Sequence, residues 1–205
     1  MTNQYLAQTA HPIDQVRRRL LKWTLFTGFT FLSPIKAFSS IPDFSAREKS
    51  ISLYNPTTHE TLTAVFWANG HYVSDALADI NHIMRDHRTN EVKPIDKGLL
   101  NVMSDIKRKL NYEKPFHVIS GYRCRKTNEL LRRRGWKAAR NSYHLTGKAA
   151  DIRLPGCRLS ALRSTALEIK GGGVGYNPAE NFVHIDVGPI RYWSYKRKKR
   201  KTKRK

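Results

Sequence analysis

Two short segments near the carboxyl end constrain the fold of this chain most. The first runs from His144 to Asp151 (HLTGKAAD), and the second, Phe182 to Asp186 (FVHID), places His184 33 residues after Asp151. Two imidazoles and a carboxylate in this arrangement are what a tetrahedral zinc site with one open position needs. The chain is therefore expected to fold so that the two segments meet, and a metal-dependent hydrolase is the first hypothesis.

The candidate metal ligands are His144, Asp151 and His184, whose side chains are of the types that bind zinc. A catalytic zinc ion uses three protein ligands and holds a water, whose pKa the ion lowers to about 7. Because the chain has eight histidines, two of them near an aspartate are a weak indication by themselves. Gly147 strengthens the hypothesis, since glycine lets the backbone turn around an ion.

The general base has two candidates. If residues 182–187 are extended, His184 and Asp186 project from the same face and lie about 7 Å apart along the strand. Asp186 is therefore the first candidate for a general base or an orienting group, and Glu180 is the second. A competing assignment makes Asp186 the ligand and His184 its neighbour.

Residues 1–39 are interpreted as a cleaved export signal. Arg17 and Arg18 precede an apolar stretch, Trp23 to Leu32, which is shorter than the roughly 20 residues that span a bilayer. The paired arginines resemble the twin-arginine type of signal, although Val16 stands where that pattern usually has serine or threonine. The alternative is an N-terminal helix packed on the domain.

Residues 40–46 are interpreted as a linker between the export signal and the domain. The mature protein is expected in the periplasm or cell envelope, without a transmembrane anchor. The formal net charge is +22, of which residues 196–205 supply nine and residues 1–39 a net four, which leaves +9 between them. This charge favours anionic partners, such as lipid head groups or envelope polymers. Nucleic acid is not expected as a partner, because the protein is predicted to be exported and shows no nucleic-acid-binding motif.

Residues 195–205 are predicted to be a disordered basic tail, with envelope binding as an alternative role.

The only two cysteines are Cys124 and Cys157. An oxidising compartment would permit a disulfide between them, closing a loop of about 34 residues worth roughly 3 to 4 kcal/mol. The alternative is two buried thiols. Neither cysteine is expected to be catalytic, because no cysteine-protease signature surrounds them.

Hydrophobic periodicity predicts an α+β domain over residues 47–194, with an antiparallel sheet and helices on one side. Strands are expected at 51–54, 62–67, 116–119, 149–153, 174–176 and 182–187, the first two as an N-terminal hairpin. Helices are expected at 75–87, 96–110, 128–134 and 160–170. Ser74 or Asp75, Asp96 and Thr127 are placed to cap the first three helices.

Three separated motifs resemble those of a known family. They are SGYRCRKTN at 120–128, SYHLTGKAAD at 142–151, and GGVGY at 172–176 followed by FVHIDVGPIRYW at 182–193. In this order they look like the exported murein endopeptidase branch of the D-Ala-D-Ala zinc metallopeptidase family, which shares its fold with the hedgehog signalling domain. The resemblance extends from about residue 47 to residue 193, including DHRTN at 86–90 and PID at 94–96.

The resemblance implies a hedgehog-like fold and zinc ligation by His144, Asp151 and His184. It also implies that Arg123 contacts a carboxylate or carbonyl of the substrate, and that two further residues line the cleft, Ser142 and Tyr176. The chain departs from the pattern at Asn181, where many relatives carry a carboxylate three residues before the last histidine.

The reaction implied is hydrolysis of a peptide bond in the stem-peptide cross-links of peptidoglycan. A carboxypeptidase that trims terminal D-amino acids is a second hypothesis, because the motifs do not separate the two activities. A zinc-bearing but inactive wall-binding module is a third, which the missing acid at Asn181 favours.

Overall fold

The computed structural model describes residues 48–136 and 138–195. The strands are β1 (Glu48–Tyr54), β2 (Thr61–Ala68), β3 (His71–Tyr72), β4 (Phe116–Ser120), β5 (Ala149–Arg153), β6 (Gly173–Asn177), β7 (Phe182–Asp186) and β8 (Arg191–Ser194). The helices are α2 (Ser74–Ile83), α3 (Lys97–Lys109), α4 (Arg125–Arg133) and α5 (Leu159–Ile169), with a 3-10 turn, η2, at Tyr143–Thr146. The expected export signal, the linker and residues 196–205 of the expected tail lie outside this range. Within it, no helix is both long enough and apolar enough to cross a bilayer.

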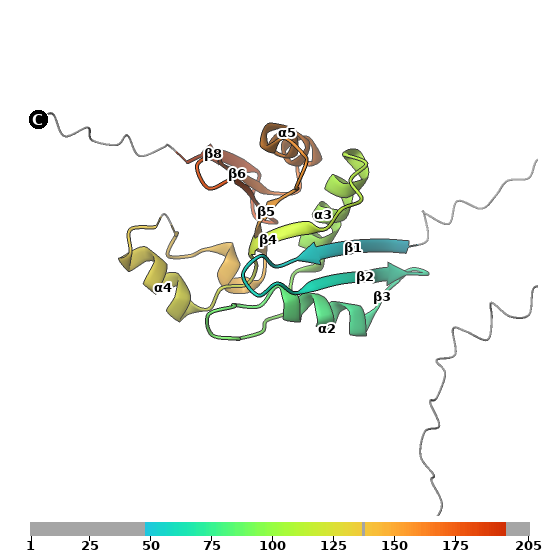
Figure 1. The fold of residues 1–205 in the computed structure, drawn as a ribbon, viewed down its shortest axis with the longest axis horizontal. Helices are drawn as coiled ribbons and strands as arrows, with labels where there is room; N and C mark the ends of the chain where they lie inside the picture. Colours follow the sequence, from blue (N-terminus) through green and yellow to red (C-terminus); the bar gives the residue numbers. More distant parts are fainter. Residues whose placement is uncertain (1–47, 137, 196–205) are drawn as a thin grey trace, which may run out of the picture. The chain divides into compact units, whose positions relative to one another are not determined.

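All eight strands form one sheet, in the order β3-β2-β1-β4-β5-β7-β6-β8 (Figure 1). This confirms the α+β fold class and the N-terminal hairpin of β1 and β2. The sheet is mixed rather than wholly antiparallel, because β1 pairs with β4, and β6 with β8, in parallel. The β1–β4 connection contains two helices, which provides the long crossover that a parallel pair requires.

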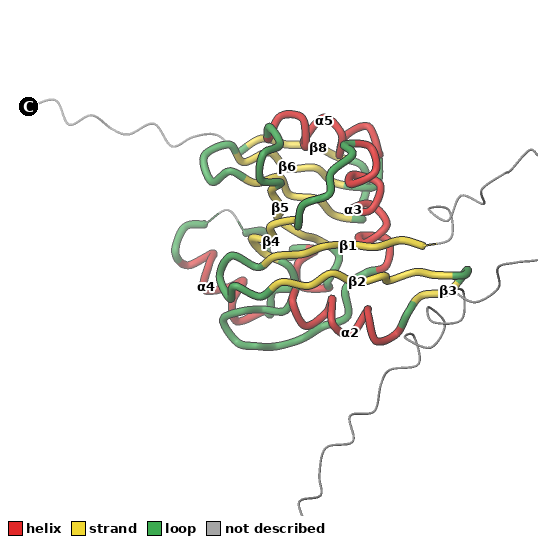
Figure 2. Tube along the Cα trace, turned by 45° about the vertical axis from the view of Figure 1, so that its right-hand side comes forward, coloured by secondary structure: helices red, strands yellow, loops and turns green. Residues whose placement is uncertain are grey.

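Helices α2, α3 and α5 cover one face of the sheet, as Figure 2 shows. Ile80, Met103 and Leu162, one from each helix, belong to the same buried cluster as Ile152 of β5 and Ile185 of β7. Because side chains alternate along a strand, the neighbours of these sheet residues project from the opposite face.

Of the three cap residues predicted from the sequence, the structure confirms one. Asp96 caps α3 as predicted, and its side chain accepts a hydrogen bond from the backbone of Gly98 at 2.8 Å. Helix α2 begins at Ser74, after an N-cap residue, Val73, that forms no side-chain cap bond. The prediction of a cap by Ser74 or Asp75 was therefore wrong, because the helix begins one residue earlier than its polar residues suggest.

Helix α4 also begins earlier than predicted. Its cap is Cys124, whose Sγ accepts a hydrogen bond from the backbone N–H of Thr127 at 3.4 Å. Thr127 therefore lies in the first turn instead of capping the helix.

The predicted disulfide is also wrong, since Cys124 and Cys157 are both free thiols. Cys124 follows the end of β4 and Cys157 follows the end of β5. Because these strands are antiparallel, the two cysteines lie at opposite ends of the pair.

Strands β3 and β8 were not predicted, since two and four residues are too short for a clear alternation. Strand β8 pairs with β6 so that Trp193 lies opposite Gly175. A Cβ atom at Gly175 would lie 2.6 Å from the indole ring of Trp193, so only glycine leaves room for this ring. The pairing makes β8 the edge strand of the sheet, with β6 between it and β7.

Candidate metal centre

Strand pairing brings two of the three candidate ligands together. Asp151 of β5 lies directly opposite His184 of β7 in the antiparallel ladder. The residues that flank them, such as Ile152 and Ile185, belong to the core under the helices. Asp151 and His184 therefore project from the other face of the sheet, where cross-strand neighbours are close enough to share a ligand.

The third candidate, His144, is positioned by the η2 turn. Ser142 caps this turn, and its Oγ accepts a hydrogen bond from the backbone N–H of His144 at 3.4 Å. The turn ends at Gly147, whose φ of 68° is in the left-handed region that favours glycine. A Cβ atom there would lie 2.3 Å from the carbonyl oxygen of Pro94. The chain therefore reverses between His144 and Asp151, as the sequence predicts.

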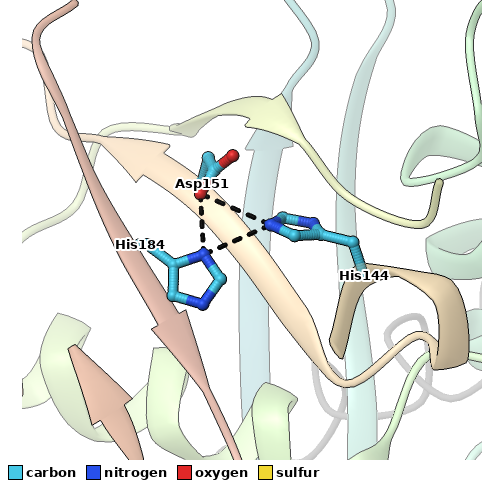
Figure 3. A group of neighbouring side chains, drawn as sticks. All are labelled: His144, Asp151 and His184. Carbon is cyan, nitrogen blue, oxygen red and sulfur yellow. Dashed lines mark hydrogen bonds and ion pairs between the residues drawn. The ribbon is translucent and has the colours of Figure 1, made fainter. Parts of the chain in front are cut away.

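The three side chains converge on one point (Figure 3). Nδ1 of His184 lies 2.9 Å from Oδ1 of Asp151, and Nε2 of His144 lies 3.2 Å from Nδ1 of His184 and 3.5 Å from Oδ1 of Asp151. Two ligands about 2.1 Å from a tetrahedral zinc ion are about 3.4 Å apart, so these separations match a metal site closely. All three residues are buried, and they could hold a metal ion.

The second nitrogen of each ring is held by the protein. Nδ1 of His144 donates to the carbonyl oxygen of Gly121 at 2.7 Å, which leaves Nε2 with a lone pair directed into the site. Nε2 of His184 donates to Oδ2 of Asp186 at 2.9 Å, which leaves Nδ1 in the same role. Such outer partners fix the tautomer of a metal-binding histidine and orient its ring.

Burial and charge set the protonation of the ligands. Burial opposes ionisation of Asp151, but the charge and hydrogen bonds of His144 and His184 outweigh it and hold the pKa of Asp151 well below its usual range. Burial lowers the pKa of His144, which favours its neutral form. A carboxylate beside a neutral imidazole is the form in which these groups bind metal.

Asp186 is buried and holds several donors at once. Its carboxylate accepts the hydrogen bond from His184 and two more from the Arg191 guanidinium, at 3.1 and 2.7 Å. It also accepts hydrogen bonds from the backbone N–H groups of Gly173 at 3.1 Å and Gly188 at 2.8 Å. Burial opposes ionisation, but the bonds from His184 and Arg191 keep the pKa of Asp186 below its usual range. These contacts favour the orienting role over the general base. Sequence analysis missed Arg191, because its contact depends on the bend between β7 and β8.

Glu180, the second candidate for the base, lies on a turn at the surface. It is exposed in the turn between β6 and β7, where its backbone N–H donates to Oδ1 of Asn177 at 3.2 Å. The ligand cluster found among the described residues does not include it.

Arg123 is brought beside the ligands, as the resemblance implies. Its side chain is buried, with Nη2 3.9 Å from Oδ2 of Asp151 and Nη1 3.5 Å from Oδ1 of Asn128. Its Nε has no hydrogen-bond partner within the described part of the chain. Burial lowers the pKa of Arg123, but a guanidinium still keeps its charge. A buried cation with an unused donor beside the ligands can receive an anionic group.

Tyr176 does not line the site. It lies opposite Val183 in the sheet, and its ring packs against the guanidinium of Arg163 from α5, 5.2 Å from the ring centre. Tyr176 is thus on the helix-covered face, so the expectation that it lines the cleft is wrong. The alternation of β6 puts Gly175, not Tyr176, on the face that carries His184.

Three aromatic side chains that were not predicted to be part of the site lie near the candidate ligands. The ring of Trp193 is 5.1 Å from that of His184, and Tyr195 is 6.3 Å from Trp193 and 6.1 Å from Phe182. Burial raises the pKa of Tyr195. The aromatic residues at 192–195 were a signal in the sequence, but only the pairing of β8 with β6 shows which ones reach the site.

Comparison with known proteins agrees with this geometry. The family Peptidase_M15_2, described as Peptidoglycan L,D-endopeptidase MepK, matches residues 43–193. The chain is 39% identical over 180 residues to Peptidoglycan L,D-endopeptidase MepK of Escherichia coli (strain K12), which covers 88% of this chain and 98% of the relative. It is 34% identical over 183 residues to Probable peptidoglycan L,D-endopeptidase MepK of Haemophilus influenzae, covering 88% and 97%. With this match over most of its length and a His-Asp-His group able to hold a metal, the chain belongs to the Peptidase_M15_2 family.

Proposed function

We propose that this chain is a zinc-dependent peptidase that cuts peptide cross-links of peptidoglycan, with the L,D-endopeptidase activity for which its relatives are named. The family match supports the substrate and the reaction. One observation supports binding of a metal ion: the donor atoms of His144, Asp151 and His184 lie 2.9 to 3.5 Å from one another. Both histidines have their second nitrogen bound outside the cluster, so the remaining nitrogen of each faces the other two side chains, where an ion would be held.

A zinc ion held by these ligands would polarise the scissile carbonyl and lower the pKa of a water ligand. Asp186 keeps His184 in the tautomer that presents Nδ1. Arg123 would bind a free carboxylate of the stem peptide, since a guanidinium fork matches a carboxylate. Trp193 would limit the access of water beside His184.

The choice of proton acceptor between Asp186 and Glu180 rests on the hydrogen bonds that each carboxylate already makes and on its exposure. The carboxylate of Asp186 is already engaged by Arg191, His184 and backbone N–H groups, so we assign it the orienting role. Glu180 is exposed and is the remaining candidate for accepting a proton when substrate covers the site.

The location proposed is the cell envelope. Arg17 and Arg18, followed by the apolar stretch, support export through a twin-arginine-type signal, and the basic residues 196–205 support binding to anionic envelope polymers. Replacing Arg17 and Arg18 by lysine should retain the protein in the cytoplasm, as measured by cell fractionation. Export at the unchanged rate would contradict this type of signal.

The test of the function is digestion of purified peptidoglycan sacculi by the zinc-loaded full chain. Metal analysis and mass spectrometry of the muropeptides should show bound zinc and loss of cross-links. His144→Ala and His184→Ala should lose both zinc and hydrolysis, whereas His71→Ala, at an exposed histidine on β3, should lose neither. Trimmed stems with intact cross-links would indicate a carboxypeptidase, and bound zinc without products would indicate a wall-binding module.

A further inference from the structure

A hollow lined mainly by arginines lies outside the metal centre. It has a volume of about 550 Å³, and five exposed residues line it: Arg125, Glu129, Arg132, Arg133 and Arg140. Four belong to α4, and Arg140 belongs to the segment that leads from α4 to the η2 turn. Figures 1 and 2 both place α4 apart from α3 and α5. We call this group the α4 arginine cluster.

The arginines of the α4 arginine cluster have no salt-bridge partner among the described residues. No ion pair or side-chain hydrogen bond joins any of its arginines to another residue between 48 and 195, with residue 137 excluded from that statement. Elsewhere on the domain, exposed cations pair with acids, as Arg108 does with Asp105 at 3.0 Å and Lys109 with Glu168 at 2.9 Å. Four guanidinium groups and one carboxylate around a solvent-filled hollow create a positive potential that attracts anions.

A hydrogen-bonded link connects the cluster to the metal centre. Asn128 of α4 accepts a bond from Arg123 at 3.5 Å and donates one to the carbonyl oxygen of Ala139 at 2.9 Å. Arg123 is the buried cation beside Asp151, and Ala139 immediately precedes Arg140 of the cluster. Asn128 lies on the buried side of α4 and the arginines of the cluster lie on its exposed side, so the cluster faces solvent on a helix that is tied to the metal centre.

We propose that the α4 arginine cluster binds carboxylates of peptidoglycan stem peptides neighbouring the one that is cut. This inference rests on the function proposed above. Guanidinium groups recognise carboxylates through two parallel hydrogen bonds, and stem peptides end in free carboxylates that a wall presents in large numbers. The cluster would raise the time that the enzyme spends on an intact wall without taking part in the chemistry.

The test compares zinc-loaded full-length proteins on two substrates. The double variant Arg132→Gln/Arg133→Gln should need about fivefold more sacculi for half-maximal rate, the size expected for two exposed charge contacts. Its kcat/KM on a soluble cross-linked muropeptide dimer should not change. The matched control is Arg108→Gln/Lys109→Gln on α3, which removes the same charge and should behave as wild type on both substrates.

Chemical modification of the wall identifies the ligand. After the stem carboxylates are amidated, the double variant and the wild type should need the same amount of sacculi for half-maximal binding, measured by sedimentation and not by cleavage. A fivefold difference that persists on amidated sacculi, or an equal effect of the α3 control, would overturn the proposal. Loss of the difference after removal of wall phosphopolymers with hydrofluoric acid would assign the site to phosphate instead. If wild type cleaves neither substrate, the proposed function fails, which is a different result from each of these.

Discussion

Oδ2 of Asp186 accepts a hydrogen bond from Nε2 of His184 at 2.9 Å, two residues away on the same strand. The bond leaves Nδ1 of His184 facing Asp151 and His144. Arg191 holds Asp186 from the other side, so the orientation of one ligand depends on a chain of contacts that begins on β8. Asp186 thus acts on the metal centre through the ring of His184.

Asp186→Ala should weaken zinc binding by about 10- to 100-fold, because the variant loses the partner that orients His184. Competition with a chelator of known affinity measures this change. Asp105→Ala is a suitable control, since the one partner of Asp105 among residues 48–136 and 138–195 is Arg108, at an exposed site. An unchanged zinc affinity in Asp186→Ala would show that the ring of His184 is oriented by other contacts.

Glu180→Gln should retain zinc but lower kcat on a cross-linked muropeptide by about 10²- to 10⁴-fold, the range for loss of a general base. The exposed position of Glu180 means that the fold should not change, so the unfolding midpoint serves as a check. Glu129→Gln, at another exposed acid, is the control on the same soluble substrate. Full activity in Glu180→Gln would remove it from the mechanism.

Gly147→Ala should lower the free energy of unfolding by about 3 kcal/mol, because it adds left-handed backbone strain to a close contact with Pro94. Gly135→Ala separates these two effects. Gly135 also has a positive φ, of 75°, but a Cβ atom there meets nothing within 4 Å, so the cost should be about 1 kcal/mol from strain alone. Denaturant titration measures both, and equal losses would show that the Pro94 contact relaxes freely.

Arg85→Gln should destabilise the domain more at pH 7 than in acid. The hydrogen bond from Arg85 lowers the pKa of Glu60 from 4.5 to about 2, so this pair stabilises the fold above about pH 4.5 and loses its effect as the pH falls toward 2. Because Glu60 is partly exposed, solvent screens the pair, and the loss at pH 7 should be about 1 kcal/mol or less. Denaturant midpoints at pH 7 and pH 3 measure the difference. A larger loss at pH 3 would contradict the pairing.

Several elements follow from local sequence pattern. The strand predicted at 149–153 is β5, and α3 begins after Asp96 as the cap residue indicates. These features depend on alternation, periodicity and one short side-chain bond, all of which act between residues close in the chain. The caps of α2 and α4 were mistaken, because Val73 and Cys124 are not the residue types that usually cap a helix.

By itself, the sequence determined the three ligand types, the turn at Gly147 and the strands that carry Asp151 and His184, because each depends on short-range order. Only the tertiary structure decided which nitrogen of each histidine faces the other two side chains of the candidate metal centre, since Gly121 and Asp186 reach these rings through long-range packing. It likewise decided that Tyr176 faces the helices and that β8 brings Trp193 to the site. Strand register decides such facts, because a shift of one residue moves every side chain to the opposite face.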